Sequence, residues 1–312
     1  MALKHIKLKI QSVKKTSTVT RAMEAVSAVK MRKAQERALA TRAYARAALR
    51  ILSHITDTVD VKQHPLVHKD PSKDITCIVL VTSDKGLAGS LNAAVIKKVQ
   101  GFIGEHDLGP QTLEFICLGK RGYEYALRSG FRVLHHRVNI SDSVSEEEVR
   151  SITDEIVALQ IRGEVRKVYM TYTNFRSTFE QEAVMRQILP LRRAVLHDIV
   201  KGIVPEKGKY AELAAQNGKN SNGEEGPHAY TIEPEAREVL AEILPKLANI
   251  AVYHALLEAK ASEHSARMVA MKSATDKARD MAKELTRKFN KVRQAAITRE
   301  VSEITSGIEA MK

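Results

Sequence analysis

The sequence has no tryptophan, an aromatic content of only 4% and two cysteines in 312 residues. The cysteines are far apart, without Cys-x-x-Cys spacing, which excludes a disulfide-stapled fold and a thiolate zinc site. No apolar run is long enough to cross a bilayer, and no segment near the N-terminus resembles a secretory signal. These absences predict a soluble, intracellular chain from a reducing compartment.

The sequence also lacks the constellations that are typical of enzymes and metal sites. Its histidines form no HExxH pair, and no Gly-x-Ser-x-Gly motif is present. We therefore expect no catalytic residue, no metal and no cofactor. His254 and His264 fall on the apolar face of a predicted helix, where packing is the simpler interpretation. Cys77 and Cys117 alternate with apolar residues in predicted strands and are expected to be buried.

The net charge of +13 is concentrated at the two ends of the chain. Residues 1–50 carry 13 Lys+Arg against two acids, whereas residues 51–245 carry 24 basic and 27 acidic residues. Residues 246–312 carry 13 basic and 8 acidic residues. Such a basic end is typical of segments that bind nucleic acid, an anionic membrane surface or acidic protein loops. An organellar transit peptide would also explain an Arg-rich, acid-poor start.

A long helix is predicted at each end of the chain. Residues 1–64 contain no Gly or Pro, and at both ends apolar or small residues recur at alternating intervals of four and three. The first seam contains Ile6, Ile10, Val13, Ser17, Thr20, Glu24, Ser27, Met31, Ala34, Ala38, Thr41, Ala45, Ala48, Leu52, Ile55 and Val59. The second seam contains Ile250, His254, Leu257, Ala261, His264, Met268, Met271, Thr275, Ala278, Ala282, Leu285, Phe289, Val292 and Ala296. Two such seams predict an antiparallel coiled coil.

Near the C-terminus the apolar positions of the second helix shift by one residue. They continue as Ile297, Val301, Ile304 and Ile308. A shift of this kind predicts that the helix changes or loses its partner there.

Between the two helices, strand and helix patterns alternate, which predicts a small Rossmann-like α/β domain. The predicted strands are 75–81, 113–118, 132–138 and 167–172, and the predicted helices are 91–102, 120–129 and 145–160. The whole chain is then divided into an N-terminal helix (1–64), an α/β domain (73–205), a flexible polar loop (206–229) and a C-terminal helix (234–312). A short extended segment at 230–232 precedes the last helix.

The segment from Thr82 to Asn92 lies between a predicted strand and helix, the position of a dinucleotide-binding loop. Gly86 and Gly89 fit neither the Rossmann nor the P-loop spacing. We therefore interpret the segment as a tight strand-to-helix turn.

Four segments closely resemble the γ subunit of F-type ATP synthases. They are VTRAMEAVSAVKMRKAQ (19–35), SDKGLAGSLN (83–92), SARMVAMKSATDKA (265–278) and FNKVRQAAITREVSEITSG (289–307). Their order and their distances from both ends also match, so the resemblance covers essentially the whole chain. Two departures are Ile308, where the family usually has Ala after Gly, and the longer polar stretch at 207–228. That stretch has no Cys, so thiol regulation is not expected. The first motif begins so early that a transit peptide is not expected before it, which favours a bacterial protein.

The resemblance implies an asymmetric shaft inside a ring of three α and three β subunits. The α/β domain would lie at its foot, with the ε subunit, against the membrane c-ring. Nucleotide and catalytic residues would belong to the other subunits, and the chain would be a peripheral protein on the cytoplasmic face of the cell membrane. The residues expected from the matched motifs and from charge to contact partners are Met23, Lys30, Arg32, Arg267, Arg293, Gln294, Thr298, Tyr230 and Glu233.

A second hypothesis remains open beside the shaft. A standalone basic coiled-coil protein that binds nucleic acid would explain the charged ends, and would show affinity that falls steeply with salt. An enzyme using the α/β domain is a more distant third.

Overall fold

We describe the fold from a computed structural model, in which residues 2–58, 64–67, 73–191, 195 and 236–309 are described. The chain divides into two compact units. Unit 1 combines Met1–Ala28 with Arg267–Lys312, and unit 2 is Val29–Ala266. The predicted polar loop and the extended segment at 230–232 lie outside the described residues.

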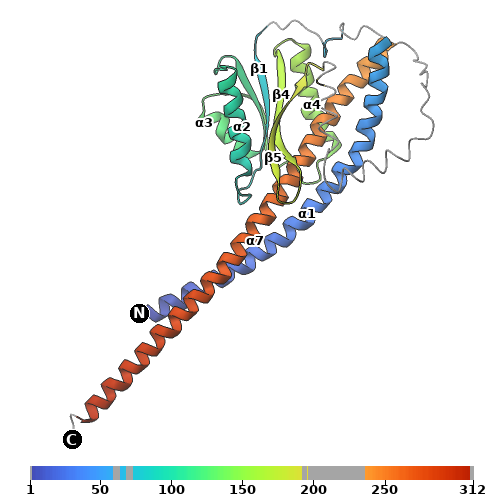
Figure 1. The fold of residues 1–312 in the computed structure, drawn as a ribbon. Coiled ribbons are helices and arrows are strands. Elements are labelled where there is room, and N and C mark those ends of the chain that lie inside the picture. Colours follow the sequence, from blue (N-terminus) through green and yellow to red (C-terminus); the bar gives the residue numbers. More distant parts are fainter. Residues whose placement is uncertain (1, 59–63, 68–72, 192–194, 196–235, 310–312) are drawn as a thin grey trace. The chain divides into compact units, whose positions relative to one another are not determined.

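Unit 2 contains a five-stranded sheet in the order β3-β2-β1-β4-β5 (Figure 1). Its strands are β1 (Thr76–Val81), β2 (Leu113–Leu118), β3 (Arg132–Arg137), β4 (Lys167–Phe175) and β5 (Gln181–Leu189). Strands β1 to β4 are parallel, whereas β5 pairs antiparallel with β4. The four predicted strands are confirmed. The strand β5 was not predicted, because its side chains are half-buried on both faces and show no clean alternation.

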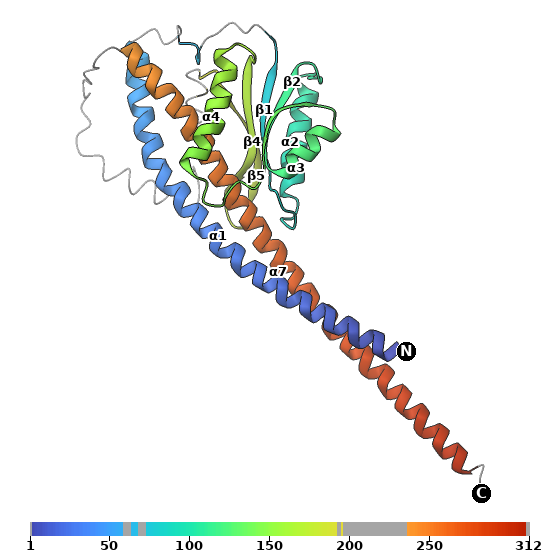
Figure 2. The same ribbon diagram turned by 180° about the vertical axis from the view of Figure 1, so that it is seen from behind.

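Alternate residues of β1 face two separate apolar cores. Cys77 and Val79 join the core formed with α4 (Glu146–Ile161) and α7 (Ala236–Glu309). Ile78 and Leu80 join the core formed with α2 (Leu91–Glu105) and α3 (Lys120–Arg128). Figure 2 shows α4 on the opposite face of the sheet from α2 and α3. Because successive side chains of a strand point to opposite faces, a continuous apolar strand requires helices on both sides.

The turn between β1 and α2 is held by its own polar side chains. The Ser83 N–H donates to Asn92 Oδ1 at 3.0 Å, and Asn92 Nδ2 donates to Ser83 Oγ at 2.7 Å. The two Asp84 carboxylate oxygens accept the N–H groups of Lys120 and Asn139, each at 2.9 Å. The expected tight turn is confirmed, and it also fastens the start of α3 and the loop after β3.

The same turn occupies further amides at the start of α3. The Gly122 N–H donates to Thr82 Oγ1 at 2.7 Å, and the Arg121 N–H donates to Ser83 O at 3.3 Å. In a nucleotide-binding α/β fold, amides at the start of a helix at this edge of the sheet bind the phosphate groups. Here the amides of Arg121 and Gly122 instead donate to the segment that follows β1, so they connect the start of α3 to that segment.

The long terminal helices are α1 (Ala2–Thr58) and α7. The helix α1 lies within the stretch that lacks Gly and Pro, whereas α7 begins before Pro245 and contains it. Within the described residues, no helix is both long and apolar enough to span a bilayer.

Candidate partner-contact surface

Unit 1 is an antiparallel pair of helices, formed by the start of α1 and the end of α7 (Figure 1). The hydroxyl groups of Thr20 and Thr275 lie 2.7 Å apart in its buried seam. An antiparallel pair aligned on these two residues places Ile10 opposite Leu285 and Leu3 opposite Val292. The register therefore brings together the apolar residues of the two predicted seams.

The burial of side chains in unit 1 follows both predicted seams. Thr20 and Ser27 are buried on α1, as are Met271, Thr275 and Ala282 on α7. Residues nearer the N-terminus, such as Ile6 and Ile10, are half-buried. The middle of this seam is small and polar, so the helices approach closely without large interlocking side chains.

The end of α7 extends beyond the start of α1. By the register set at Thr20 and Thr275, residues after Arg293 lie past the first residue of α1, a length of roughly 20 Å of helix. Every side chain described from Arg293 to Ile308 is exposed. The expected loss of the coiled-coil partner near Ile297 is thus confirmed within unit 1.

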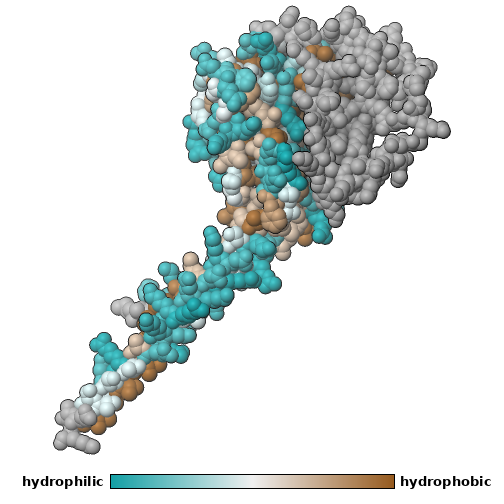
Figure 3. Space-filling model, viewed as in Figure 1, coloured by the Kyte–Doolittle hydropathy of each residue, from teal (hydrophilic) through white to brown (hydrophobic). Residues whose placement is uncertain are grey.

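This extension carries an apolar stripe on one face. Ile297, Val301, Ile304 and Ile308 are 51–59% exposed, and Figure 3 shows apolar side chains along this end of α7. The face that continues the coiled-coil seam becomes polar instead, with an ion pair between Arg299 and Glu303 at 2.8 Å. The helix end therefore presents its apolar side in a new direction, which suits a partner other than α1.

The predicted contact residues of unit 1 differ in accessibility. Arg293, Gln294 and Thr298 are exposed at the beginning of the extension. Met23 is half-buried beside the seam of α1, and Arg267 is only 8% exposed. The first three can be reached by a partner from the side, whereas most of Arg267 is covered within this chain.

In unit 2, the two predicted basic contacts have different surroundings. Arg32 is exposed on α1. The Lys30 side chain is 47% exposed, and its Nζ lies 2.7 Å from Asp142 Oδ2 in the loop between β3 and α4. The last two predicted residues, Tyr230 and Glu233, lie outside the described residues.

His264 Nε2 donates to the other carboxylate oxygen of Asp142, Oδ1, at 2.9 Å. Burial alone would raise the pKa of Asp142, but hydrogen bonds to Lys30 and His264 outweigh it and hold the pKa below its ordinary value. The carboxylate is therefore ionised at neutral pH. The predicted packing of His264 in a covered position is confirmed. Asp142 was not predicted, because no local pattern marks this residue.

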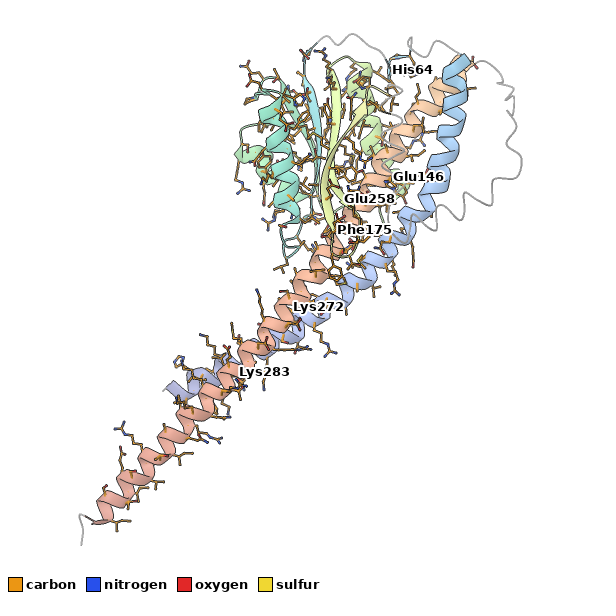
Figure 4. The ribbon with its side chains drawn as sticks, viewed as in Figure 1. His64, Glu146, Phe175, Glu258, Lys272 and Lys283 are labelled. Carbon is orange, nitrogen blue, oxygen red and sulfur yellow. The ribbon has the colours of Figure 1, made fainter. Side chains whose placement is uncertain are left out.

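A second buried pair lies where α7 faces the sheet. His254 Nε2 is 3.5 Å from Glu258 Oε1, and both side chains are at most 5% exposed. Figure 4 shows Glu258 on the side of α7 toward β4. Burial, and to a smaller extent the negative charge of Glu258, raise the pKa of Tyr172. The predicted packing role of His254 is consistent with this covered position.

Comparison with known proteins relates the whole chain to one family. Residues 2–311 match the ATP synthase family. The ATP synthase gamma chain of Roseiflexus sp. (strain RS-1) is 35% identical over 309 residues, which cover 99% of this chain and 98% of that protein. The ATP synthase gamma chain of Heliobacterium modesticaldum (strain ATCC 51547 / Ice1) is 36% identical over 309 residues, covering 99% of each.

The chain belongs to the ATP synthase gamma chain family.

The fold of this gamma chain family member is also similar to solved structures. A chain of the Euglena gracilis mitochondrial ATP synthase, in the OSCP/F1/c-ring part in rotational state 3, has a TM-score of 0.64 at 15% identity, with coverage of 99% of this chain and 94% of that chain. A chain of the rotor of the same enzyme in rotational state 1 has a TM-score of 0.60 at 13% identity, with coverage of 95% and 99%. The predicted fold class, two terminal helices flanking a small α/β domain, is confirmed.

Proposed function

We propose that this chain is the central rotor shaft of an F-type ATP synthase. It couples proton-driven rotation of a membrane c-ring to conformational cycling of the catalytic sites on β subunits, and in reverse it couples ATP hydrolysis to proton pumping. The observation that carries this proposal is the full-length relation to ATP synthase gamma chains at 35–36% identity. A rotating shaft must be asymmetric to act differently on each catalytic site, and the coil of unit 1, in which α7 extends beyond α1, is asymmetric.

The partners follow from the same role. Three α and three β subunits would surround the coil of unit 1, and the ε subunit and the c-ring would contact the α/β domain. The similar solved structures are described as rotor and as F1/c-ring assemblies, which supports these partners. The chain itself would be non-catalytic and would lie peripherally at the cytoplasmic face of the cell membrane.

Individual residues have roles of unequal support in this proposal. The stripe formed by Ile297, Val301, Ile304 and Ile308 would run in an apolar bearing, because it is exposed and faces away from the coil seam. Arg293, Gln294 and Thr298 would contact the ring near the base of that stripe, and Met23 and Arg32 would contact it along the shaft. The contact predicted for Arg267 would involve only a small part of this residue, which is 8% exposed. Lys30 would contribute less than Arg32 to acidic β loops, because it is already paired within the chain. Two points remain predictions. They are the position of Tyr230 and Glu233 near the c-ring, and the division of the chain at residues 1–64, 73–205, 206–229 and 234–312.

The proposal is tested by purifying the tagged chain from detergent-solubilised membranes of its own host. We expect one copy to be recovered with three α and three β subunits, and the eluate to hydrolyse ATP. Recovery alone, or with nucleic acid that dissociates at high salt, would refute the shaft and favour the second hypothesis.

The bearing is tested in the same complex with Val301→Ser and Ile304→Ser combined. Each substitution removes an apolar side chain whose burial contributes about 1.5–3 kcal/mol, so contact with the bearing should weaken. We expect normal subunit stoichiometry but a several-fold lower rate of ATP synthesis in membrane vesicles. Glu300→Gln changes a neighbouring exposed residue outside the stripe and should leave synthesis unchanged. Equal rates for the double variant and this control would contradict the bearing.

A further inference from the structure

Both long helices contact one aspartate in the loop between β3 and α4. Lys30 of α1 and His264 of α7 bind the two oxygens of the Asp142 carboxylate, at 2.7 Å and 2.9 Å. Arg37 of α1 donates to the main-chain oxygen of the same residue at 3.3 Å. Lys260 of α7 lies 4.0 Å from the carboxylate. We name these five residues the Asp142 joint.

The joint extends to the neighbouring main chain of the loop. Lys260 Nζ donates to Ile140 O at 2.8 Å, which holds the loop two residues before Asp142. The side chains of Lys260 and His264 are only 13% and 5% exposed, whereas that of Asp142 is 39% exposed. Several basic groups thus converge on one carboxylate at the covered side of the loop. Charge-assisted hydrogen bonds of this length are directional, so they define the position of both helices relative to the loop.

The helix α7 has further attachments to the sheet. Ser262 Oγ donates to Thr173 O at 3.0 Å, and Ser265 Oγ donates to Thr178 O at 2.8 Å. Large apolar residues of α7, including Leu256 and Leu257, are also buried in the core of unit 2. The attachment of α7 to the α/β domain is therefore both polar and apolar.

The helix α1 is held differently in unit 2. Among the α1 side chains of unit 2 that are described as far as residue 38, the buried seam residues are Ala34 and Ala38, at 2% and 6% exposure. Because alanine side chains are small and make few contacts, they let α1 pack closely. They give little resistance to sliding of α1 along its axis or to rotation about it. The long side chains of Lys30 and Arg37, both bound to Asp142, provide the directional attachment that the alanines lack.

The joint also lies near the place where both helices leave unit 2. Lys30 and His264 are within three residues of the two ends of this unit, Val29 and Ala266. Because each helix continues from unit 2 into unit 1, a load passed from the α/β domain along either helix crosses these positions. The position at which each helix is held there affects how evenly that load is shared.

We propose that Asp142 is a positioning residue of the rotary coupling, which fixes α1 as well as α7 to the α/β domain so that torque enters both helices of the shaft. The proposal rests on the proposed function as a rotor shaft. It assigns to Asp142 no contact with substrate, nucleotide or the β subunits.

The test measures the torsional stiffness of the shaft in assembled complexes. The α3β3 ring is immobilised and its turnover is blocked with azide and ADP, a probe is attached to the α/β domain, and the variance of the probe angle is recorded. With Asp142→Asn, we expect the variance to rise by up to about twofold, because the ionic attachment of α1 through Lys30 is lost while the Arg37 hydrogen bond to the main-chain oxygen remains. The matched control is Asp154→Asn, the same chemical change on α4, where the nearest ion pair is with Arg150 of the same helix.

A second variant separates the joint from general damage to the loop. Lys30→Met replaces a half-exposed side chain, keeps the carboxylate with His264 and Lys260, and should assemble normally. It should also raise the variance, and the double variant with Asp142→Asn should add little, because both substitutions remove the same attachment of α1. A merely structural role would change the yield of complex but not the variance of the complexes that assemble.

The outcomes separate the two proposals. A tagged chain that does not co-purify with α and β subunits refutes the shaft itself. Complexes that assemble and rotate, but whose variance with Lys30→Met or Asp142→Asn equals that of the Asp154→Asn control, overturn the joint alone.

Discussion

A methyl group added at Gly119 tests the packing of the connection between β2 and α3. Gly119 has a φ of +111°, and the Cβ of an alanine there would lie 2.0 Å from Thr82 O and 2.7 Å from its carbonyl carbon. Thr82 is not free to retreat, because its N–H donates to Leu118 O at 2.8 Å and its hydroxyl accepts from the Gly122 N–H at 2.7 Å. We therefore expect Gly119→Ala to destabilise unit 2 strongly.

The magnitude follows from two contributions. Holding a non-glycine residue in this backbone region costs about 1–3 kcal/mol, and forcing an extra carbon into a packed site costs about 1–3 kcal/mol more. The sum is about 4 kcal/mol, at the upper end of the range for single substitutions. For a domain of this size, that corresponds to a fall in Tm of roughly 10 °C.

The assay is thermal and urea unfolding of the full-length chain. The controls are Gly101→Ala and Gly104→Ala in α2, where an added Cβ meets nothing within 4 Å. Alanine in place of glycine within a helix should stabilise the chain by about 0.5–1 kcal/mol, so the controls and the test have opposite signs. A Gly119→Ala chain within about 1 kcal/mol of the wild type would refute the reasoning.

Two further predictions concern the coil and the core. Thr20→Val or Thr275→Val alone should lower the stability of the coil by about 0.5–1.5 kcal/mol, since the hydrogen bond between the two hydroxyls is lost. The remaining hydroxyl keeps a carbonyl acceptor in its own helix, Ser17 O for Thr20 and Met271 O for Thr275, so the double Val variant should cost no more than either single change. Amide hydrogen exchange along α1 and α7 measures this, and losses that simply add would contradict the pairing. Burial raises the pKa of Cys117 to about 12, far above the ordinary value near 8.5, so at pH 8 its thiolate is scarce and covered. Iodoacetamide should therefore label this residue in urea but not in the native chain, and similar rates in both states would exclude the buried position.

Much of the fold was predictable from local patterns. The four-three spacing of apolar and small residues predicted which face of α7 is covered as far as Val292, and the burial in unit 1 follows it. The apolar strands and the turn at residues 83–92 were predictable for the same reason, because the period and the turn residues are local properties of the sequence. The strand β5 was not predictable, since its side chains pack into the apolar cores on both faces of the sheet and its sequence mixes polar and apolar residues.

The candidate contact surface was predictable only in part. The shift of apolar residues to Ile297 and Val301 indicated a helix end without its coil partner, because a heptad pattern shows directly where it breaks. The different accessibility of Arg267 and Arg293 was not visible, since both are basic residues on one helix and only packing covers the first. For Lys30, charge alone suggested a free contact, whereas the structure pairs it within the chain.

The sequence by itself therefore determined that a long helix lies at each end, which face of each helix is covered in unit 1, and the family to which the chain belongs. These features depend on short-range periodicity and on contiguous motifs. Only the tertiary structure decided that Lys30, Asp142 and His264 meet, since they come from two helices and a loop that are far apart in the chain. No periodicity or fixed spacing in the sequence marks an ion pair between such distant residues. The pair forms only when the α/β domain packs against both helices.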